Sequence, residues 1–260
     1  MLLRHKKTFP NPVILQFVCT LTCICILPLS TFADSADEII KKVEHNLNGK
    51  TAVMNMTMVV QTKRAKRTMK LKSYSIGKDK SFIRMEYPGK DKGITFLKID
   101  NSMWQYVPRI EKTIKIPASM MLQSWMGSDF TNDDLVKESS LHEDYSKKLL
   151  KETDEEFTIE LLPNEDAAVV WGKIIMKVSK QYFLPTTVQY YDEDDMLIRE
   201  LSYTDVKPFG EKFYPTRWIM IPKEPEKSDN ITIIEISNAV FDKEVSASYF
   251  TKRALKRYSR

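Results

Sequence analysis

Short apolar runs separated by turn residues fill most of the sequence after Thr51, and they constrain the fold more than any other feature. Between residues 51 and 116 the turn signals, among them Gly77-Lys78-Asp79 and Pro88-Gly89-Lys90, recur about every ten residues. Strands joined by tight turns pair antiparallel, because a parallel pair needs a long crossover that usually contains a helix. The sequence therefore predicts a mainly β protein whose strands follow one another in an antiparallel meander.

The change of period along the chain defines the expected elements. A helix is expected at residues 36–48, because Ser35 and Glu38 form a capping box before apolar residues at helical spacing. The first strand starts at Thr51, and the others are expected at residues 69–76, 81–87, 93–99, 102–107, 112–116, 145–151, 155–162, 169–179, 186–191, 196–205, 213–221 and 230–240. Short helices are expected at 118–126 and 134–138, and a frayed basic helix at 251–260. With no linker or repeat among them, residues 34–260 are predicted to form a single domain.

The first 33 residues have the layout of a bacterial signal peptide. Arg4, Lys6 and Lys7 precede an almost wholly apolar run at 13–29, and Ala33 is small enough for the position before a cleavage site. We therefore predict export to the periplasm with cleavage of residues 1–33. An uncleaved membrane anchor is the alternative, because the apolar run is about the length at which a helix can just span a bilayer.

Cysteine and charge exclude several functions for the exported chain. All three cysteines, Cys19, Cys23 and Cys25, lie inside the leader, so disulfides and thiol catalysis are excluded after cleavage. None of them follows a small residue as a lipoprotein signal requires. Loss of the three basic residues of the leader lowers the formal net charge from +5 to +2, which argues against nucleic acid as a partner.

The remaining residues offer no recognisable catalytic or metal site. His45 and His142 are interpreted as solvated, since neither lies near a GxSxG-type nucleophile turn. No cluster of His, Asp and Glu has metal-ligand spacing. The sequence therefore predicts no catalytic residue, no metal and no cofactor, and a binding protein rather than an enzyme.

Methionine is the unusual feature of the mature chain. Met54, Met56 and Met58 share one face of the first strand, where Ile and Val are the usual residues. Flexible, polarizable Met side chains suit surfaces that adapt to variable apolar ligands. A Met-rich and Trp-containing segment at 118–126 is interpreted as a lid over an apolar cavity, although a Met-rich core with ordinary helix-on-sheet packing explains the pattern equally well. The predicted cavity lining consists of Met54, Met56, Met58, Met69, Met85, Phe96, Met103, Met121, Leu122 and Trp125.

Two basic clusters are set apart in the sequence. One covers residues 63–67 at a predicted hairpin tip, and the other comprises the basic residues of the tail at 252–260. Solvated surface charge is the simple interpretation. Attraction to anionic lipid headgroups or to an acidic partner is the functional one.

The order of several motifs resembles that of the bacterial outer-membrane lipoprotein-sorting protein family, the LolA-like periplasmic carriers. After the leader, the helix and the Met-rich strand, the motifs are 104–108 (WQYVP), 112–116 (KTIKI), 126–135 (MGSDFTNDDL), 184–191 (LPTTVQYY) and 214–218 (YPTRW). The resemblance covers most of the mature chain, and the 126–135 segment is its most specific part.

This resemblance implies both a fold and a function. The implied fold is an unclosed, strongly curved antiparallel β-barrel, with an N-terminal helix and short helices that cover a cavity. The implied function is that of a monomeric periplasmic chaperone in outer-membrane biogenesis, which shields the acyl chains of a lipoprotein or lipid during transport. An inner-membrane exporter and an outer-membrane acceptor are the implied partners. A lipid-sensing regulator, an accessory to a lipid exporter and an exported hydrolase that uses His45 or His142 are the alternatives.

Overall fold

The computed structural model describes residues 35–137 and 141–260, and these residues belong to one compact unit that spans residues 34–260. The predicted signal peptide lies outside the described residues. Within the part of the chain that is described, no helix is both long and apolar enough to cross a membrane.

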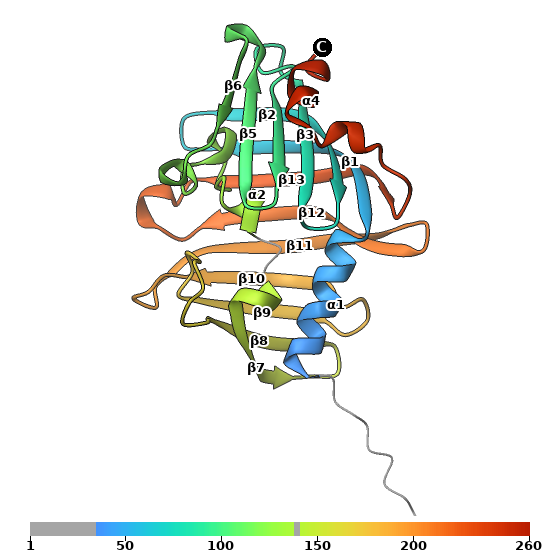
Figure 1. Ribbon diagram of the computed structural model, residues 1–260. Coiled ribbons are helices and arrows are strands. Elements are labelled where there is room, and N and C mark those ends of the chain that lie inside the picture. Colours follow the sequence, from blue (N-terminus) through green and yellow to red (C-terminus); the bar gives the residue numbers. More distant parts are fainter. Residues whose placement is uncertain (1–34, 138–140) are drawn as a thin grey trace, which may run out of the picture. The chain divides into compact units, whose positions relative to one another are not determined.

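A single antiparallel sheet of thirteen strands makes up most of this unit (Figure 1). The strands are β1 Thr51–Gln61, β2 Lys66–Ile76, β3 Lys80–Tyr87, β4 Thr95–Ile99, β5 Ser102–Val107, β6 Lys112–Lys115, β7 Tyr145–Glu152, β8 Glu156–Pro163, β9 Lys173–Ser179, β10 Pro185–Tyr191, β11 Leu197–Phe209, β12 Lys212–Pro222 and β13 Ile231–Phe241. Their spatial order, β6-β5-β4-β3-β2-β1-β13-β12-β11-β10-β9-β8-β7, joins two meanders through the pairing of β1 with β13. Strands β6 and β7 are the two edges, so the curved sheet stays open. The predicted mainly β, unclosed architecture is confirmed.

Among the strand boundaries that differ from the prediction, two have a local explanation. Strand β9 begins at Lys173 rather than at residue 169. The backbone of Gly172, just before it, lies against that of Asp192. A Cβ atom on Gly172 would lie 2.5 Å from the Asp192 carbonyl oxygen, so this close approach requires glycine. Strand β11 continues to Phe209, so the turn before β12 is shorter than predicted. Gly210 takes a φ of +66° in this turn, a conformation that favours glycine.

The N-terminal helix α1 (Ala36–Asn48) lies across strands of the β7–β12 half of the sheet (Figure 1). The Ser35 hydroxyl accepts a hydrogen bond from the Glu38 backbone N–H, and the Glu38 carboxylate accepts one from the Ser35 N–H, both at 3.2 Å. This capping box starts the helix as predicted. Ile39, Ile40 and Val43 are fully buried against the sheet, so the apolar stripe of α1 forms one wall of the core.

The segment after β6 does not form the predicted helix at 118–126. It contains two short 3₁₀ helices, Ala118–Met120 and Trp125–Gly127, and Met126 inside the second helix has a positive φ of 52°. The Asn132 side-chain amide donates to the carbonyls of Met120 and Gln123. These side-chain bonds satisfy carbonyls that a continuous helix would bond along its own backbone, so the segment folds as a loop.

The other helices are short. They are α2 (Asp134–Lys137), which starts as predicted, α3 (Leu141–Asp144) and α4 (Lys252–Arg257), with further 3₁₀ helices at Pro108–Ile110, Pro225–Lys227 and Ala247–Tyr249.

The C-terminal helix α4 is docked, and the prediction of a frayed tail is wrong. Leu255 is fully buried, and the Leu255 carbonyl accepts a hydrogen bond of 2.8 Å from the Thr95 hydroxyl on β4. Leu255 packs in a cluster with Phe82 of β3 and Leu97 of β4. The adjacent residues on these strands, Ile83 and Phe96, belong to the main core instead. Because successive strand residues point to opposite faces, the C-terminal segment covers the second face of the sheet over β3 and β4.

Candidate ligand-binding cavity

A cavity of about 240 Å³ lies between α1, the main-core face of the sheet and the segment around Trp125. Most of its wall is apolar. The apolar and aromatic lining residues are Val43, Leu47, Ala52, Met54, Met56, Leu71, Ile83, Trp125, Leu135, Leu141, Met176, Pro185, Val188, Tyr190, Tyr203, Tyr214, Trp218 and Ile234. A concave apolar wall of this kind, with few polar groups, is typical of a small-molecule binding site.

The predicted lining residues fall into three groups. Met54, Met56 and Trp125 line the cavity. Met58, Met69, Met85, Phe96 and Met103 are buried in the core that surrounds it, and Met121 packs against this core from the edge. Leu122 is 59% exposed and lines a separate surface hollow beside Ser128. The structure thus brings nine of the ten residues to one core and places Leu122 outside it.

The sequence prediction omitted the lining that comes from distant elements. Val43 and Leu47 belong to the apolar stripe of α1, and aromatic residues such as Tyr190 and Tyr214 come from strands β10 to β12. Alternation of residues along these strands was a usable signal. Nothing local in the sequence shows, however, that these strands face the Met-rich strand β1.

Trp125 combines an apolar contact with a polar donor. Its ring packs edge-on against Phe96, with 5.4 Å between the ring centroids, and the residue is only 3% exposed. Its indole Nε1 has no hydrogen-bond partner among the described residues. A buried donor without a partner costs about 1–3 kcal/mol, so Trp125 adds one unsatisfied polar group to a mostly apolar wall.

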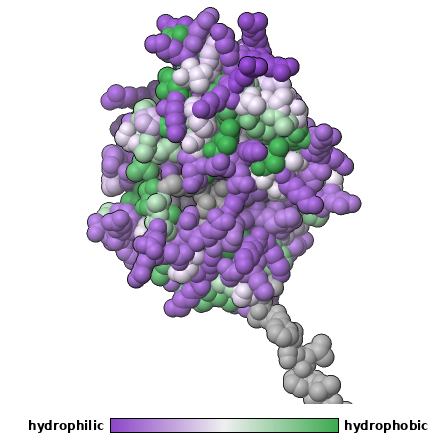
Figure 2. Space-filling model, viewed as in Figure 1, coloured by the Kyte–Doolittle hydropathy of each residue, from purple (hydrophilic) through white to green (hydrophobic). Residues whose placement is uncertain are grey.

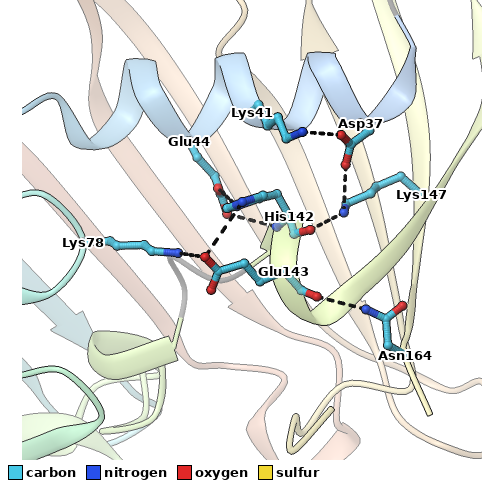
Figure 3. Close-up of polar contacts among 8 residues, drawn as sticks. All are labelled: Asp37, Lys41, Glu44, Lys78, His142, Glu143, Lys147 and Asn164. Carbon is cyan, nitrogen blue, oxygen red and sulfur yellow. Dashed lines mark hydrogen bonds and ion pairs between the residues drawn. The ribbon is translucent and has the colours of Figure 1, made fainter. Parts of the chain in front are cut away.

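A polar network lies at one end of the cavity and joins α1, α3 and the turn between β2 and β3 (Figure 3). The Glu44 carboxylate, which lines the cavity, lies 2.7 Å from His142 Nδ1 and accepts a second bond from the His142 backbone N–H. Lys78, also a lining residue, forms a 2.5 Å ion pair with Glu143. Burial raises the pKa of Glu44, and the hydrogen bonds from His142 oppose this rise.

The same network extends to the start of α1. The Asp37 carboxylate contacts Lys41 at 2.7 Å and Lys147 at 3.1 Å, and the hydrogen bonds from these two lysines lower the pKa of Asp37. Lys147 also donates to the His142 carbonyl. His142 is therefore half-buried and paired, which corrects its interpretation as a solvated histidine. Its side-chain contacts in the described part of the chain are carboxylates, and none is a hydroxyl nucleophile.

A buried ion pair holds the segment before α2 against the sheet. The guanidinium of Arg199 on β11 binds both carboxylate oxygens of Asp134, with an Nη1–Oδ2 distance of 2.7 Å. The same guanidinium stacks on the rings of Trp171 and Tyr190, at 4.4 Å and 4.6 Å from their centroids. Thr131 and Asp134 also exchange side-chain hydrogen bonds with each other's backbone. Residues 126–135 are thereby anchored beside the cavity.

No group of three or more His, Cys, Asp and Glu side chains that could hold a metal ion is found among the described residues. What the geometry offers chemically is an apolar interior with a charged edge.

The open antiparallel sheet that curves around an apolar cavity, with a helix across it, is a fold shared with several solved structures. The chain is similar to a LolA superfamily protein from Nitrosomonas europaea, with a TM-score of 0.70 and 20% identity over 85% of this chain and 100% of that chain. It is also similar to a proposed outer membrane lipoprotein-sorting protein domain from Vibrio parahaemolyticus, with a TM-score of 0.73 and 22% identity over 85% and 98% of the two chains. These similarities confirm the expected fold.

A third similar structure is a DUF1329 family protein from Desulfovibrio piger, with a TM-score of 0.77 and 21% identity over 85% of this chain and 97% of that chain. Residues 77–257 match the model of a family described as uncharacterized, and the protein belongs to this family. No curated protein sequence matches the chain at a significant level.

Proposed function

We propose that the protein is a periplasmic carrier that shields the acyl chains of a lipoprotein or lipid during transfer between the envelope membranes. Residues 1–33 would direct its export. Residues 34–260 would form the single carrier domain, which acts without catalysis.

The apolar cavity inside the open sheet is the observation that carries this proposal. Met54, Met56 and Trp125 contribute to a wall that is apolar over most of its extent. Transfer of an acyl chain from water to such a site gains about 0.8 kcal/mol for each buried CH₂ group. A dozen or more methylene groups would supply most of the affinity, and little directional bonding would be needed. The fold shared with LolA-superfamily proteins supports the same function.

The size of the cavity indicates that loading requires movement. Its volume of about 240 Å³ lies slightly below the range of about 300–1,000 Å³ that is usual for small-molecule sites. The segment at 118–126 contributes Trp125 to the wall and contains no regular helix longer than one 3₁₀ turn. We propose that this segment moves outward when the ligand enters and folds back into the space when the ligand leaves.

The proposal is tested by measuring acyl binding with a matched pair of variants. Met56→Glu places a charge in the cavity wall, and the affinity for a fluorescent fatty acid should fall at least about tenfold because a buried charge opposes apolar contact. Met196→Glu makes the same change at a side chain that is 60% exposed in the turn between β10 and β11, and it should leave the affinity unchanged. Equal loss in both variants, or no binding by the wild-type protein, contradicts the proposal.

Lipid mass spectrometry of the protein purified from its native membranes identifies the ligand. A carrier should copurify with acylated molecules and transfer them between vesicles. Capture of one membrane regulator at a fixed ratio, without transfer, would favour a lipid sensor instead. Hydrolysis of a lipid that is abolished by substituting His45 and His142 together would favour an enzyme.

A further inference from the structure

The two basic clusters of the sequence both contact the β3–β4 loop, at one end of the β1–β6 half of the sheet. The β1–β2 hairpin at 62–65 and the β3–β4 loop at 88–93 lie at the same end, because Lys70 on β2 pairs with Tyr87 on β3. Arg67, beside the hairpin, lies 4.0 Å from Asp91 of the loop. The hairpin cluster is thereby joined to the neighbouring strand ends.

The chain terminus reaches the same end from the other face of the sheet. A Cβ atom on Gly93 would lie 2.2 Å from the Ser259 carbonyl oxygen and 3.3 Å from the Pro108 side chain, so these backbones are in close contact. Lys256 lies 3.7 Å from Glu111 in the β5–β6 turn. Four segments, 62–65, 88–93, 108–111 and 256–260, therefore converge, and we name their joint surface the basic end. The surface around α4 and the β5–β6 turn, at the top of the view, is mostly hydrophilic (Figures 1 and 2).

The charge of the basic end is strongly one-sided. Its four segments carry eight basic residues and two acidic ones, whereas the mature chain as a whole is near neutral. The basic residues are Lys63, Arg64, Lys90, Lys92, Arg109, Lys256, Arg257 and Arg260, all of them exposed. Such a cluster attracts an anionic surface within about 10 Å, the range that salt screening permits.

Two further features fit a lipid surface. Ile110 and Tyr87 are 53% and 51% exposed beside these charges, and apolar and aromatic side chains of this kind insert at the boundary between headgroups and acyl chains. A hollow of about 330 Å³ beside these charges is lined by Lys92 and Arg260 and by the ion pair of Arg84 with Glu86, so its lining carries a net positive charge. Arg67 also donates to the Met126 carbonyl at 3.1 Å, so the basic end is linked to the segment that contributes Trp125 to the cavity wall.

We infer that the basic end is a docking surface for an anionic phospholipid bilayer. This inference rests on surface charge and exposed apolar side chains, and it does not depend on which ligand the cavity holds.

Vesicle flotation of residues 34–260, the protein without its predicted leader, tests the inference. These residues form one compact unit. Binding is expected to vesicles of equal parts phosphatidylglycerol and phosphatidylcholine, and not to phosphatidylcholine alone. The variant Lys63→Gln/Arg64→Gln/Arg257→Gln/Arg260→Gln should bind at least about tenfold more weakly. Lys148→Gln/Lys151→Gln/Lys207→Gln/Lys243→Gln removes equal charge from exposed residues elsewhere and should change binding about twofold at most.

The results separate this inference from the proposed carrier function. The variant with a neutralised basic end should retain fatty-acid binding, and Met56→Glu should retain vesicle binding.

Ile110→Ser should weaken vesicle binding at every salt concentration, because it removes an apolar contact. Equal binding to both vesicle types, equal loss in the two charge variants, or binding only to an acidic protein overturns the inference. Circular dichroism and thermal melting verify that each variant is folded.

Discussion

The charged residues near the cavity are held by partners far away in the sequence. Arg199 is paired with Asp134, and Glu44 with His142. In both cases a group that is costly to bury is compensated by a specific contact from another element. The two pairs differ in what they hold together: the first anchors residues 126–135 to β11, and the second joins α1 to α3.

Removal of Arg199 is predicted to be strongly destabilising. Its side chain is 5% exposed, and Arg199→Ala leaves the Asp134 carboxylate buried without its cation. We expect the free energy of unfolding to fall by about 3–5 kcal/mol, measured by urea denaturation. The double variant Arg199→Met/Asp134→Leu should lose less than the single variant, since neither charge is then left unpaired. A loss below about 1 kcal/mol for Arg199→Ala would contradict a structural role for this pair.

Glu44 is predicted to make stability depend on pH. Burial raises its pKa in the folded protein above the ordinary value of 4.5, so the folded state binds the proton more tightly than the unfolded state does. The stability contributed by Glu44 is then present below the ordinary pKa and is lost as pH rises through the raised pKa. Relative to Glu44→Gln, the wild-type protein should lose stability as the pH rises above the ordinary carboxyl pKa of 4.5.

Glu143 supplies a control of opposite sign for this titration. The hydrogen bond from Lys78 lowers the pKa of Glu143, so relative to Glu143→Gln the wild-type protein should gain stability as pH rises from acid. Urea denaturation at several pH values measures both differences. A flat difference for Glu44→Gln across this range would contradict the assigned burial of Glu44.

At the scale of elements, the C-terminal segment closes a second core that the N-terminal part of the sheet leaves exposed. Tyr249 stacks on Tyr74 with a centroid distance of 4.0 Å, and Tyr258 packs edge-on against Phe82. Hydrogen bonding by Tyr74 and burial raise the pKa of Tyr249 to about 12. The tail is thus part of the folded domain.

Leu255→Ala is predicted to test the docking of α4. Its side chain is fully buried, and a Leu→Ala change at such a site costs about 2–5 kcal/mol through lost apolar contact and a residual cavity. Arg253→Ala, an exposed neighbour on the same helix, should change stability by about 0.5 kcal/mol at most. Chemical denaturation compares the two. Similar small effects in both variants would mean that α4 is not anchored through Leu255.

At the scale of the whole molecule, ligand binding should stabilise the fold. The cavity is lined by residues from α1 and from strands on both sides of the β1–β13 pairing, so an acyl chain bound as proposed would contact both meanders. Binding to the folded state alone adds about 2.7 kcal/mol when the ligand is at 100 times its Kd. For a domain of this size we expect the Tm to rise by about 5–10 °C.

Differential scanning fluorimetry with a saturating fatty acid measures this shift, and Met56→Glu provides the control. The variant should show little rise in Tm at the same ligand concentration. A rise that is equal in wild type and variant would place the ligand outside the cavity.

The sequence by itself determined the succession of elements. The capping box at Ser35, the alternation from Thr51 and the turn residues between strands are local, because they act through backbone conformation and neighbouring side chains. They were therefore enough to predict the antiparallel meander and nearly all of its strands. Local signals also predicted a helix at 118–126 that does not form. The Asn132 side chain, which bonds carbonyls of this segment, lies outside it in the sequence.

Only the tertiary structure decided which residues meet. The curvature of the open sheet turns Met54 and Met56 toward the cavity, buries Met58 and Met69 beneath it and places Leu122 outside. It also brings the basic hairpin of residues 63–67 and the C-terminal tail to the same loop between β3 and β4. These contacts join segments tens to hundreds of residues apart, and they depend on how thirteen strands twist and pair as a whole. No short stretch of sequence contains that information.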